Sequence, residues 1–158
     1  MSLPRDLKHV SVLWAGVDHA DDVAACHRAL FTEAWDKATF EGLLSDPTST
    51  SLIARHGHPQ ETIGFIVGRL AADEAEILTF GVTADWQRHG VGKRLLEGMA
   101  RAAKRAEAKR IFLEVAADNL PATVLYSRLG FRESGRRKGY YARSGQPAAD
   151  ALVLSLAL

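Results

Sequence analysis

Residues 76–115 read EILTFGVTADWQRHGVGKRLLEGMARAAKRAEAKRIFLEV, and the period of their apolar positions changes twice. Glu76–Val82 and Ile111–Val115 are mainly apolar, β-branched and aromatic, which favours buried strands. Between them, from Gly90 to Glu107, apolar residues recur every three or four positions, which predicts an amphipathic helix. This order forms a βαβ unit, so we expect a parallel strand pair joined by a right-handed crossover.

The flanking sequence predicts further strands and helices on both sides of this unit. Asp18 and Asn119 are expected to cap the first and last helices, and Gly130 to follow the last one. The other expected strands are Val10–Trp14, Ser51–Arg55, Thr62–Leu70, Phe131–Arg137 and Ala149–Leu156, and the other expected helices are Asp18–Phe31, Lys37–Leu44 and one from Asn119 to Gly130. The predicted fold class is mixed α/β, with a parallel centre of the sheet and antiparallel flanks.

The composition excludes several classes of protein. The chain has 158 residues, and its 20 Lys+Arg and 19 Asp+Glu leave a net charge of +1. One globular domain over residues 1–158 is therefore expected, rather than a disordered chain or a nucleic-acid-binding domain. The single Cys26 cannot form an intramolecular disulfide, which excludes a disulfide-rich secreted scaffold.

The ends of the chain and its apolar runs predict the compartment. Residues 1–8 mix charged and apolar positions and lack the continuous apolar core of a signal peptide. The longest apolar runs, Val10–Val17 and Ala151–Leu158, are shorter than the roughly 20 residues of a membrane-spanning helix. We therefore expect a cytoplasmic protein, a monomer or weak homodimer, that binds neither membrane nor nucleic acid.

The connection between the first strand of the βαβ unit and its helix has the composition of an anion-binding loop. Gly90 and Gly92 allow a tight turn, so that several backbone N–H groups can converge on a phosphate or pyrophosphate. Three basic side chains add positive charge there: Arg88, His89 and Lys93.

Neither of the two common nucleotide-binding motifs fits this loop. A P-loop would need Ser or Thr where Arg94 follows Lys93, and the dinucleotide fingerprint would need a third glycine where Leu95 stands. A Gly-x-Gly turn before a helix is also compatible with a plain connection.

The loop sequence resembles a known signature. Gln87-Arg88-His89-Gly90-Val91-Gly92 is similar to the Gln/Arg-x-x-Gly-x-Gly/Ala motif of the GCN5-related N-acetyltransferases. The resemblance implies an acyl-CoA N-acyltransferase fold, in which the parallel strand pair splays apart, and acetyl-CoA as cosubstrate. It assigns the pantetheine to Phe80, Gly81, Val82 and Asn119, and the pyrophosphate to Gln87, Arg88, His89, Gly90, Val91, Gly92 and Lys93.

The resemblance narrows to one branch of that family. The matching positions include Leu113-Glu114-Val115, Asn119, Leu125-Tyr126, Leu129-Gly130-Phe131, Arg137, Tyr140-Tyr141 and Asp150-Ala151. They are similar to the pattern of the ribosomal-protein alanine N-acetyltransferases (RimI-like). The resemblance therefore implies acetylation of a protein N-terminal α-amine.

Transfer of an acetyl group to an amine requires a base, an oxyanion donor and an acid for the departing thiolate. Glu114 is the candidate base, although it could instead be an outward-facing strand residue. Tyr126 is the candidate acid and a cofactor contact, although tyrosines on helices commonly pack in a core. A backbone N–H of the Phe80–Val82 strand would hold the oxyanion.

The candidate acceptor-binding residues are aromatic. The resemblance places Tyr140 and Tyr141 beside an acceptor peptide and Trp35 in the loop between the first two helices, although packing roles would also explain all three. No metal is expected, because His56 and His58 lack further ligands at a recognisable spacing. A small-molecule amine or amino-acid acetyltransferase, or a catalytically silent CoA-binding module, remains an alternative to acetylation of protein N-termini.

Overall fold

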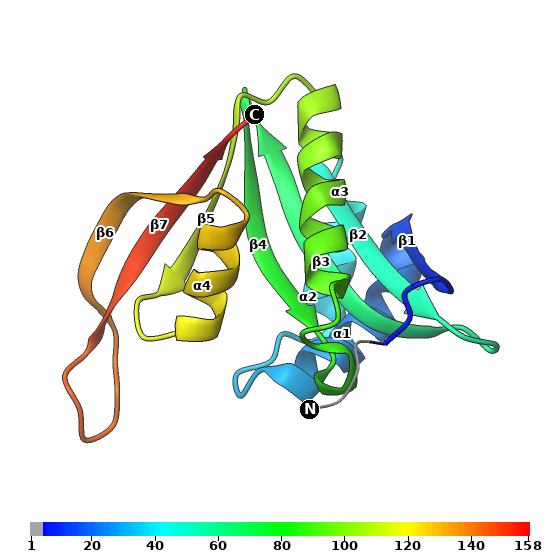
Figure 1. Cartoon of the computed structure of the whole chain (residues 1–158), viewed down its shortest axis with the longest axis horizontal. Helices are drawn as coiled ribbons and strands as arrows, with labels where there is room; N and C mark the ends of the chain where they lie inside the picture. The colour runs from blue at the N-terminus through cyan, green and yellow to red at the C-terminus, as the bar shows by residue number, and fades with distance from the viewer. Residues whose placement is uncertain (1–4) are drawn as a thin grey trace.

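The computed structural model describes residues 5–158, which form one mixed sheet flanked by helices on both faces (Figure 1). The sheet order is β1-β2-β3-β4-β5-β7-β6. The strands are β1 (Val10–Trp14), β2 (Ser49–His56), β3 (Glu61–Ala71), β4 (Glu74–Val82), β5 (Arg110–Ala116), β6 (Arg132–Tyr141) and β7 (Ala149–Ala157). The helices are η1 (Val17–His19), α1 (Ala20–Leu30), α2 (Lys37–Ser45), η2 (Ala84–Trp86), α3 (Val91–Arg105) and α4 (Leu120–Arg128).

The pairing of β4 with β5 is parallel, whereas all other strand pairs are antiparallel. The predicted fold class and the βαβ unit are thereby confirmed. The parallel ladder is short, because only Glu74–Glu76 pair with Arg110–Phe112. Beyond these residues the two strands diverge toward their carboxyl ends (Figure 1).

Two hydrophobic clusters cover the two faces of the sheet. The first contains the buried face of α3, with Val91, Leu95 and Met99, together with Leu113 and Tyr126. The second packs α1 and α2 against β2 and β3. The amphipathic pattern of residues 90–107 therefore predicted correctly which side of α3 is buried.

Most element boundaries lie within two residues of the expected ones, and the differences at the start of α1 and the end of β6 have identifiable local causes. Asp18 does not cap α1, because a short 3-10 turn at Val17–His19 precedes the helix. There, Nδ1 of His19 accepts a hydrogen bond from the Gly16 N–H at 2.9 Å. At the other end, β6 runs on to Tyr141 instead of ending at Arg137, with an irregular register between Arg137 and Tyr141.

Candidate active site

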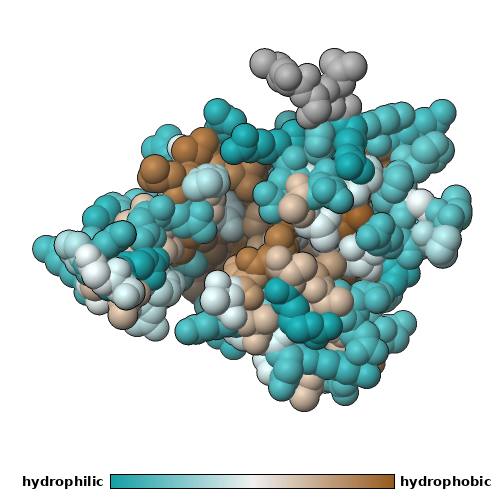
Figure 2. All heavy atoms as spheres, turned by 90° about the horizontal axis from the view of Figure 1, so that it is seen from below, coloured by the Kyte–Doolittle hydropathy of each residue, from teal (hydrophilic) through white to brown (hydrophobic). Residues whose placement is uncertain are grey.

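A cavity of about 1060 Å³ opens where β4 and β5 diverge. Viewed from that end, the surface is hollowed near its centre, and hydrophobic side chains lie in the hollow (Figure 2). Its walls come from β4, the loop before α3, β5 and α4, and Phe31 also reaches it from the end of α1. Because β4 has no strand partner on this side beyond Glu76 within residues 5–158, its backbone groups are available to a ligand.

The loop before α3 is held in a strained conformation. Arg88 (φ 64°) and Gly90 (φ 96°) both adopt left-handed backbone angles. The Gln87 side chain ties the loop back to the strand, since its Nε2 donates to the Val82 carbonyl at 2.9 Å. This turn leads directly into α3, whose first N–H groups have no intrahelical acceptor and therefore favour an anion.

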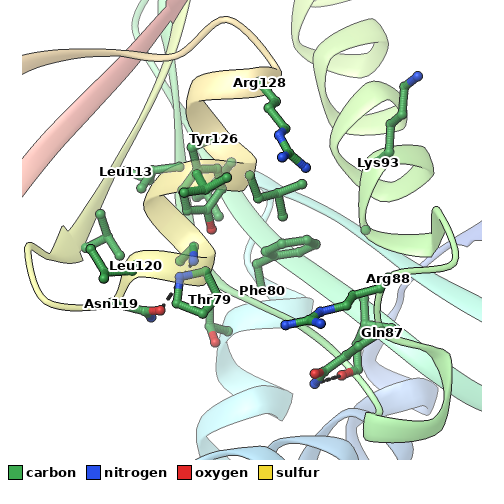
Figure 3. A pocket seen from close by; sticks show the side chains of 18 of the residues that line it. Thr79, Phe80, Gln87, Arg88, Lys93, Leu113, Asn119, Leu120, Tyr126 and Arg128 are labelled. Carbon is green, nitrogen blue, oxygen red and sulfur yellow. Dashed lines mark hydrogen bonds between the residues drawn. The ribbon is translucent and has the colours of Figure 1, made fainter. Parts of the chain in front are cut away.

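Two basic residues line this end of the cavity: Arg88 of the loop, whose side chain points into the cavity, and Lys93 in the first turn of α3 (Figure 3). Gly92 lies against the apolar wall, where a Cβ atom would lie 3.1 Å from Cζ of Phe80. The cavity therefore combines an apolar wall with one electropositive end, which matches a long ligand that carries phosphates at one end.

Three residues predicted to contact the cofactor do not line the cavity. The His89 ring turns to the amino-terminal segment, where its Nδ1 accepts from the Arg5 N–H at 2.8 Å. Val91 is buried in the core cluster under α3. A Cβ atom at Gly81 would lie 2.7 Å from Leu30 Cδ1, so this position packs against α1. For His89 and Val91, only the backbone is in a position to contact a ligand at the loop.

Tyr126 lies in the last turn of α4 and is only 7% exposed. Its ring packs near Phe80 and Phe131, with centroid distances of 6.2 and 5.5 Å. The hydroxyl points into the cavity (Figure 3) and has no hydrogen-bond partner among residues 5–158. Burial raises the pKa of this phenol far above its usual range, so the group is a neutral O–H donor at physiological pH.

Glu114 also lines the cavity, from the opposite face of the sheet. Its neighbours Leu113 and Val115 are buried in the cluster with α3 and α4, so strand alternation turns Glu114 to the side of α1 and α2. Its side chain is 28% exposed, and its Oε2 lies 3.2 Å from Nε of Arg137. One carboxylate and one phenol thus reach the same cavity from opposite faces.

Asn119 lies at the start of α4 and lines the cavity. Its Oδ1 accepts from the Ala122 N–H at 3.3 Å, which confirms the predicted N-cap. Pro121 fits in the first turn, where a helix needs no N–H at this position.

The three predicted acceptor residues lie outside the cavity lining. Trp35 packs on His27, with ring centroids 5.2 Å apart, in the loop between α1 and α2. Tyr140 and Tyr141 form a T-shaped pair with centroids 5.0 Å apart at the end of β6. Burial, followed by the negative charge of Glu114, raises the pKa of Tyr141, which places this pair near the candidate base.

Several residues that line the cavity were not predicted as site residues, among them Phe31, Leu120, Val124 and Arg128. Leu120 and Val124 are 65% and 47% exposed, one helical turn apart on α4. A four-residue spacing of apolar side chains on the outer face of a helix is the signal that could have indicated them. The sequence gives no comparable indication that Arg128 lines a cavity. A basic residue in the last turn of a helix is already explained by its favourable interaction with the helix dipole.

Comparison with known proteins identifies this arrangement. The family model described as "Acetyltransferase (GNAT) family" matches residues 17–131. The chain belongs to the acetyltransferase (GNAT) family. It is therefore an acetyltransferase, and the resemblance found in its sequence is confirmed.

Individual relatives of the GNAT chain agree with this assignment. "N-alpha-acetyltransferase RimI" of Mycobacterium tuberculosis is 33% identical over 126 residues, which cover 77% of this chain and 75% of the relative. The crystal structure of the ribosomal-protein-S18-alanine N-acetyltransferase from Escherichia coli aligns with a TM-score of 0.85 at 23% identity, over 94% and 93% of the two chains. Arabidopsis thaliana NAA60 in complex with acetyl-CoA aligns with a TM-score of 0.80 at 22% identity, over 94% and 98%.

The described part of the GNAT chain lacks two further kinds of feature. Residues 5–158 contain no group of three or more His, Cys, Asp or Glu side chains placed to hold a metal ion. Across the same residues, no helix combines the length and the apolar character that a membrane crossing requires.

Proposed function

We propose that the protein transfers the acetyl group of acetyl-CoA directly to the α-amine of a protein N-terminus. The observation that carries this proposal is the cavity that Tyr126 and Glu114 enter from opposite faces of the sheet. A thioester on the side of α3 and α4 could thus meet an amine that arrives from the side of α1 and α2. The names of the relatives favour an α-amine, and a ribosomal protein beginning with alanine is the candidate acceptor.

The cosubstrate would lie along β4 and the loop before α3. Acetyl-CoA supplies an activated acetyl thioester. The unpaired backbone edge of β4 near Phe80 and Val82 can hydrogen-bond its pantetheine, while Asn119 lies across the cavity on α4. The N–H groups at Gly90–Lys93, with the Arg88 and Lys93 side chains, can hold the pyrophosphate.

The reaction requires two proton movements in addition to acyl transfer. An α-ammonium has a reference pKa of about 7.7–8.0, so Glu114 first accepts a proton from it, directly or through a water. The neutral nitrogen then forms a bond to the thioester carbon, and the carbon–sulfur bond breaks. Tyr126 donates its proton to the departing sulfur and regains one from the amide nitrogen or solvent, so the net products are the acetylated amine, CoA and one proton.

The test is a comparison of acceptors with the purified full-length chain. We would incubate it with acetyl-CoA and peptides that differ only in their first residue, beside free polyamines and amino acids, and measure CoA release. Release that depends on the peptide, fastest for one N-terminal residue, is the expected result, and mass spectrometry should place the acetyl group on the α-nitrogen.

Two other outcomes would contradict the proposal. Release with free amines alone would favour a small-molecule acetyltransferase that uses the same cosubstrate site. Binding of acetyl-CoA without turnover of any amine would favour a catalytically silent CoA-binding module.

A further inference from the structure

The hairpin β6–β7 is attached to the end of β5 by two ion pairs that involve residues far apart in the sequence. Arg143, in the loop after β6, pairs with Asp118, which lies between β5 and α4. Arg137, within β6, pairs with Glu114 on β5. In Figure 1 the long loop of this hairpin projects from the end of the sheet, on the side where β5 leads into α4.

The Arg143–Asp118 pair has the geometry of a strong ion pair. Nε of Arg143 lies 2.8 Å from Oδ2 of Asp118, and Nη2 lies 2.9 Å from Oδ1, so the contact is bidentate. The hydrogen bonds from Arg143 hold the pKa of the Asp118 carboxyl below its usual range. This pair therefore stays ionised on both sides at neutral pH.

Each arginine also lies over one of the two tyrosines. The Arg137 guanidinium lies 5.1 Å from the centroid of the Tyr140 ring, and that of Arg143 lies 5.6 Å from the Tyr141 ring. The tyrosine pair is thus held between two arginines, and each arginine is anchored by a carboxylate on β5 or in the turn that follows it.

Backbone pairing alone would hold this part of the hairpin weakly. The β6–β7 register is irregular between Arg137 and Tyr141, and Gly139 and Gly145 both have positive φ angles. The Asp150 carboxylate accepts the Gly139 N–H at 2.9 Å, which fixes one side of the irregularity. On the side that faces α4, the Arg143–Asp118 ion pair holds the hairpin in place.

We propose that Arg143 is a positioning residue for the acceptor: its bidentate pair with Asp118 holds Tyr140 and Tyr141 beside Glu114 and thereby sets the affinity for the acceptor peptide. This inference rests on the proposed function, in which the tyrosines contact that peptide. Neither Arg143 nor Asp118 lines the cavity, so neither is a catalytic residue here.

A double-mutant cycle on Arg143→Gln and Asp118→Asn tests the proposal. Each single variant should raise the KM for the peptide by roughly three- to fivefold, the range expected for a partly exposed ion pair. The value of kcat and the Kd for acetyl-CoA should stay unchanged. A general loss of folding would instead impair both. The double variant should lose no more than either single variant.

Arg132→Gln is the matched control, because Arg132 is an exposed arginine at the start of β6, in the same hairpin, with no ion pair among residues 5–158. Equal KM values for Arg143→Gln and Arg132→Gln would overturn the proposal. Additive losses in the double variant would also overturn it, because Arg143 would then act independently of Asp118.

Hydrogen exchange separates this inference from the proposed function. Amide exchange across residues 138–146 should become faster in Asp118→Asn than in the unmodified chain, whether or not a peptide is acetylated. If no peptide is a substrate, the proposed function fails while this measurement still tests the ion pair. Unchanged exchange in this segment would overturn the positioning role.

Discussion

Tyr126 has the two properties that an acid catalyst at this site requires, a neutral hydroxyl and access to the cavity. Tyr126→Phe should lower kcat by about 100-fold or more, as expected for loss of a general acid. The Kd for acetyl-CoA should change little, because the ring and its packing against Phe80 are retained. Turnover by CoA release and binding by calorimetry would measure the two effects, and full activity of this variant would exclude Tyr126 as the acid.

Glu114 should matter most where the acceptor is protonated. Glu114→Gln is expected to slow peptide acetylation most at about pH 6–7, because the α-amine is then mainly an ammonium. The rates of the two proteins should converge near about pH 9, where the amine is neutral without help. Glu133→Gln, which removes an exposed carboxylate of β6, is the control, and profiles that run parallel for Glu114→Gln would indicate a structural role only.

At the residue scale, sequence reasoning selected Tyr126 and Glu114 because the residue types fit the chemistry, and the structure brings both to one cavity. It could not foresee Phe31 or Arg128, which reach the cavity from the ends of two helices that are distant in sequence. Their positions depend on how α1 and α4 lie on the sheet, and no local pattern encodes that.

At the scale of elements, the loop before α3 depends on a left-handed backbone conformation at Gly90, directly before the helix. Gly90→Glu should abolish acetyl-CoA binding, because it places a β-carbon at φ 96° and a negative charge where phosphates would lie. Gly90→Asn is the control, since asparagine tolerates this backbone conformation without adding charge. Calorimetric titration should show about 100-fold weaker binding or none for the Glu variant and a much smaller loss for the Asn variant. Equal affinities for the Glu variant and the unmodified chain would contradict the phosphate assignment.

Helix α1 carries a buried histidine that links it to the next loop. His27 is 2% exposed, stacks on Phe31, and accepts the Trp35 N–H at its Nδ1 at 3.1 Å. Burial lowers the pKa of His27, so the folded state favours the neutral ring. The stabilisation is present above the unfolded-state pKa of about 6.5 and is lost as the pH falls below it.

His27→Leu should therefore flatten the acid limb of the stability profile. Thermal unfolding between about pH 8 and pH 5 should show a smaller fall in Tm for the variant than for the unmodified chain. A fall of equal size in both proteins would show that His27 does not cause the acid sensitivity.

The elements themselves were largely predictable because their apolar periods are clear. The strand at Val10–Trp14 has the predicted bounds, and the α3 pattern correctly indicated its buried face. The predicted start of α1 at Asp18 was wrong, because a 3-10 turn at Val17–His19 comes first and no side chain caps the helix at His19. Whether a short 3-10 turn precedes a helix depends on backbone geometry that residue types alone do not specify.

For the whole molecule, the net charge of +1 conceals a local concentration of positive charge. Arg88, Lys93 and Arg128 all line the cavity, on the loop before α3, on α3 and on α4 (Figure 3). A polyanionic cosubstrate should therefore bind more weakly as NaCl screens these charges.

Arg128→Gln should reduce this dependence on salt. The Kd for acetyl-CoA should rise in the variant at low salt, and its increase with NaCl should be shallower than for the unmodified chain. Arg132→Gln, which changes the net charge equally without lining the cavity, is the control. Equal salt slopes for both variants would show that Arg128 contributes only to the overall charge.

The sequence by itself determined the mixed α/β class and the βαβ unit, and it placed a glycine-containing basic loop at residues 87–93, because each depends on local periodicity, turn residues and short spacing. Only the tertiary structure decided where β4 and β5 diverge and from which face of the sheet Glu114 reaches the cavity. It also brought Arg143 into contact with Asp118, 25 residues earlier in the sequence. Contacts of this kind depend on how strands twist and how helices pack on them. These are properties of the whole sheet, so no single segment of the sequence specifies them.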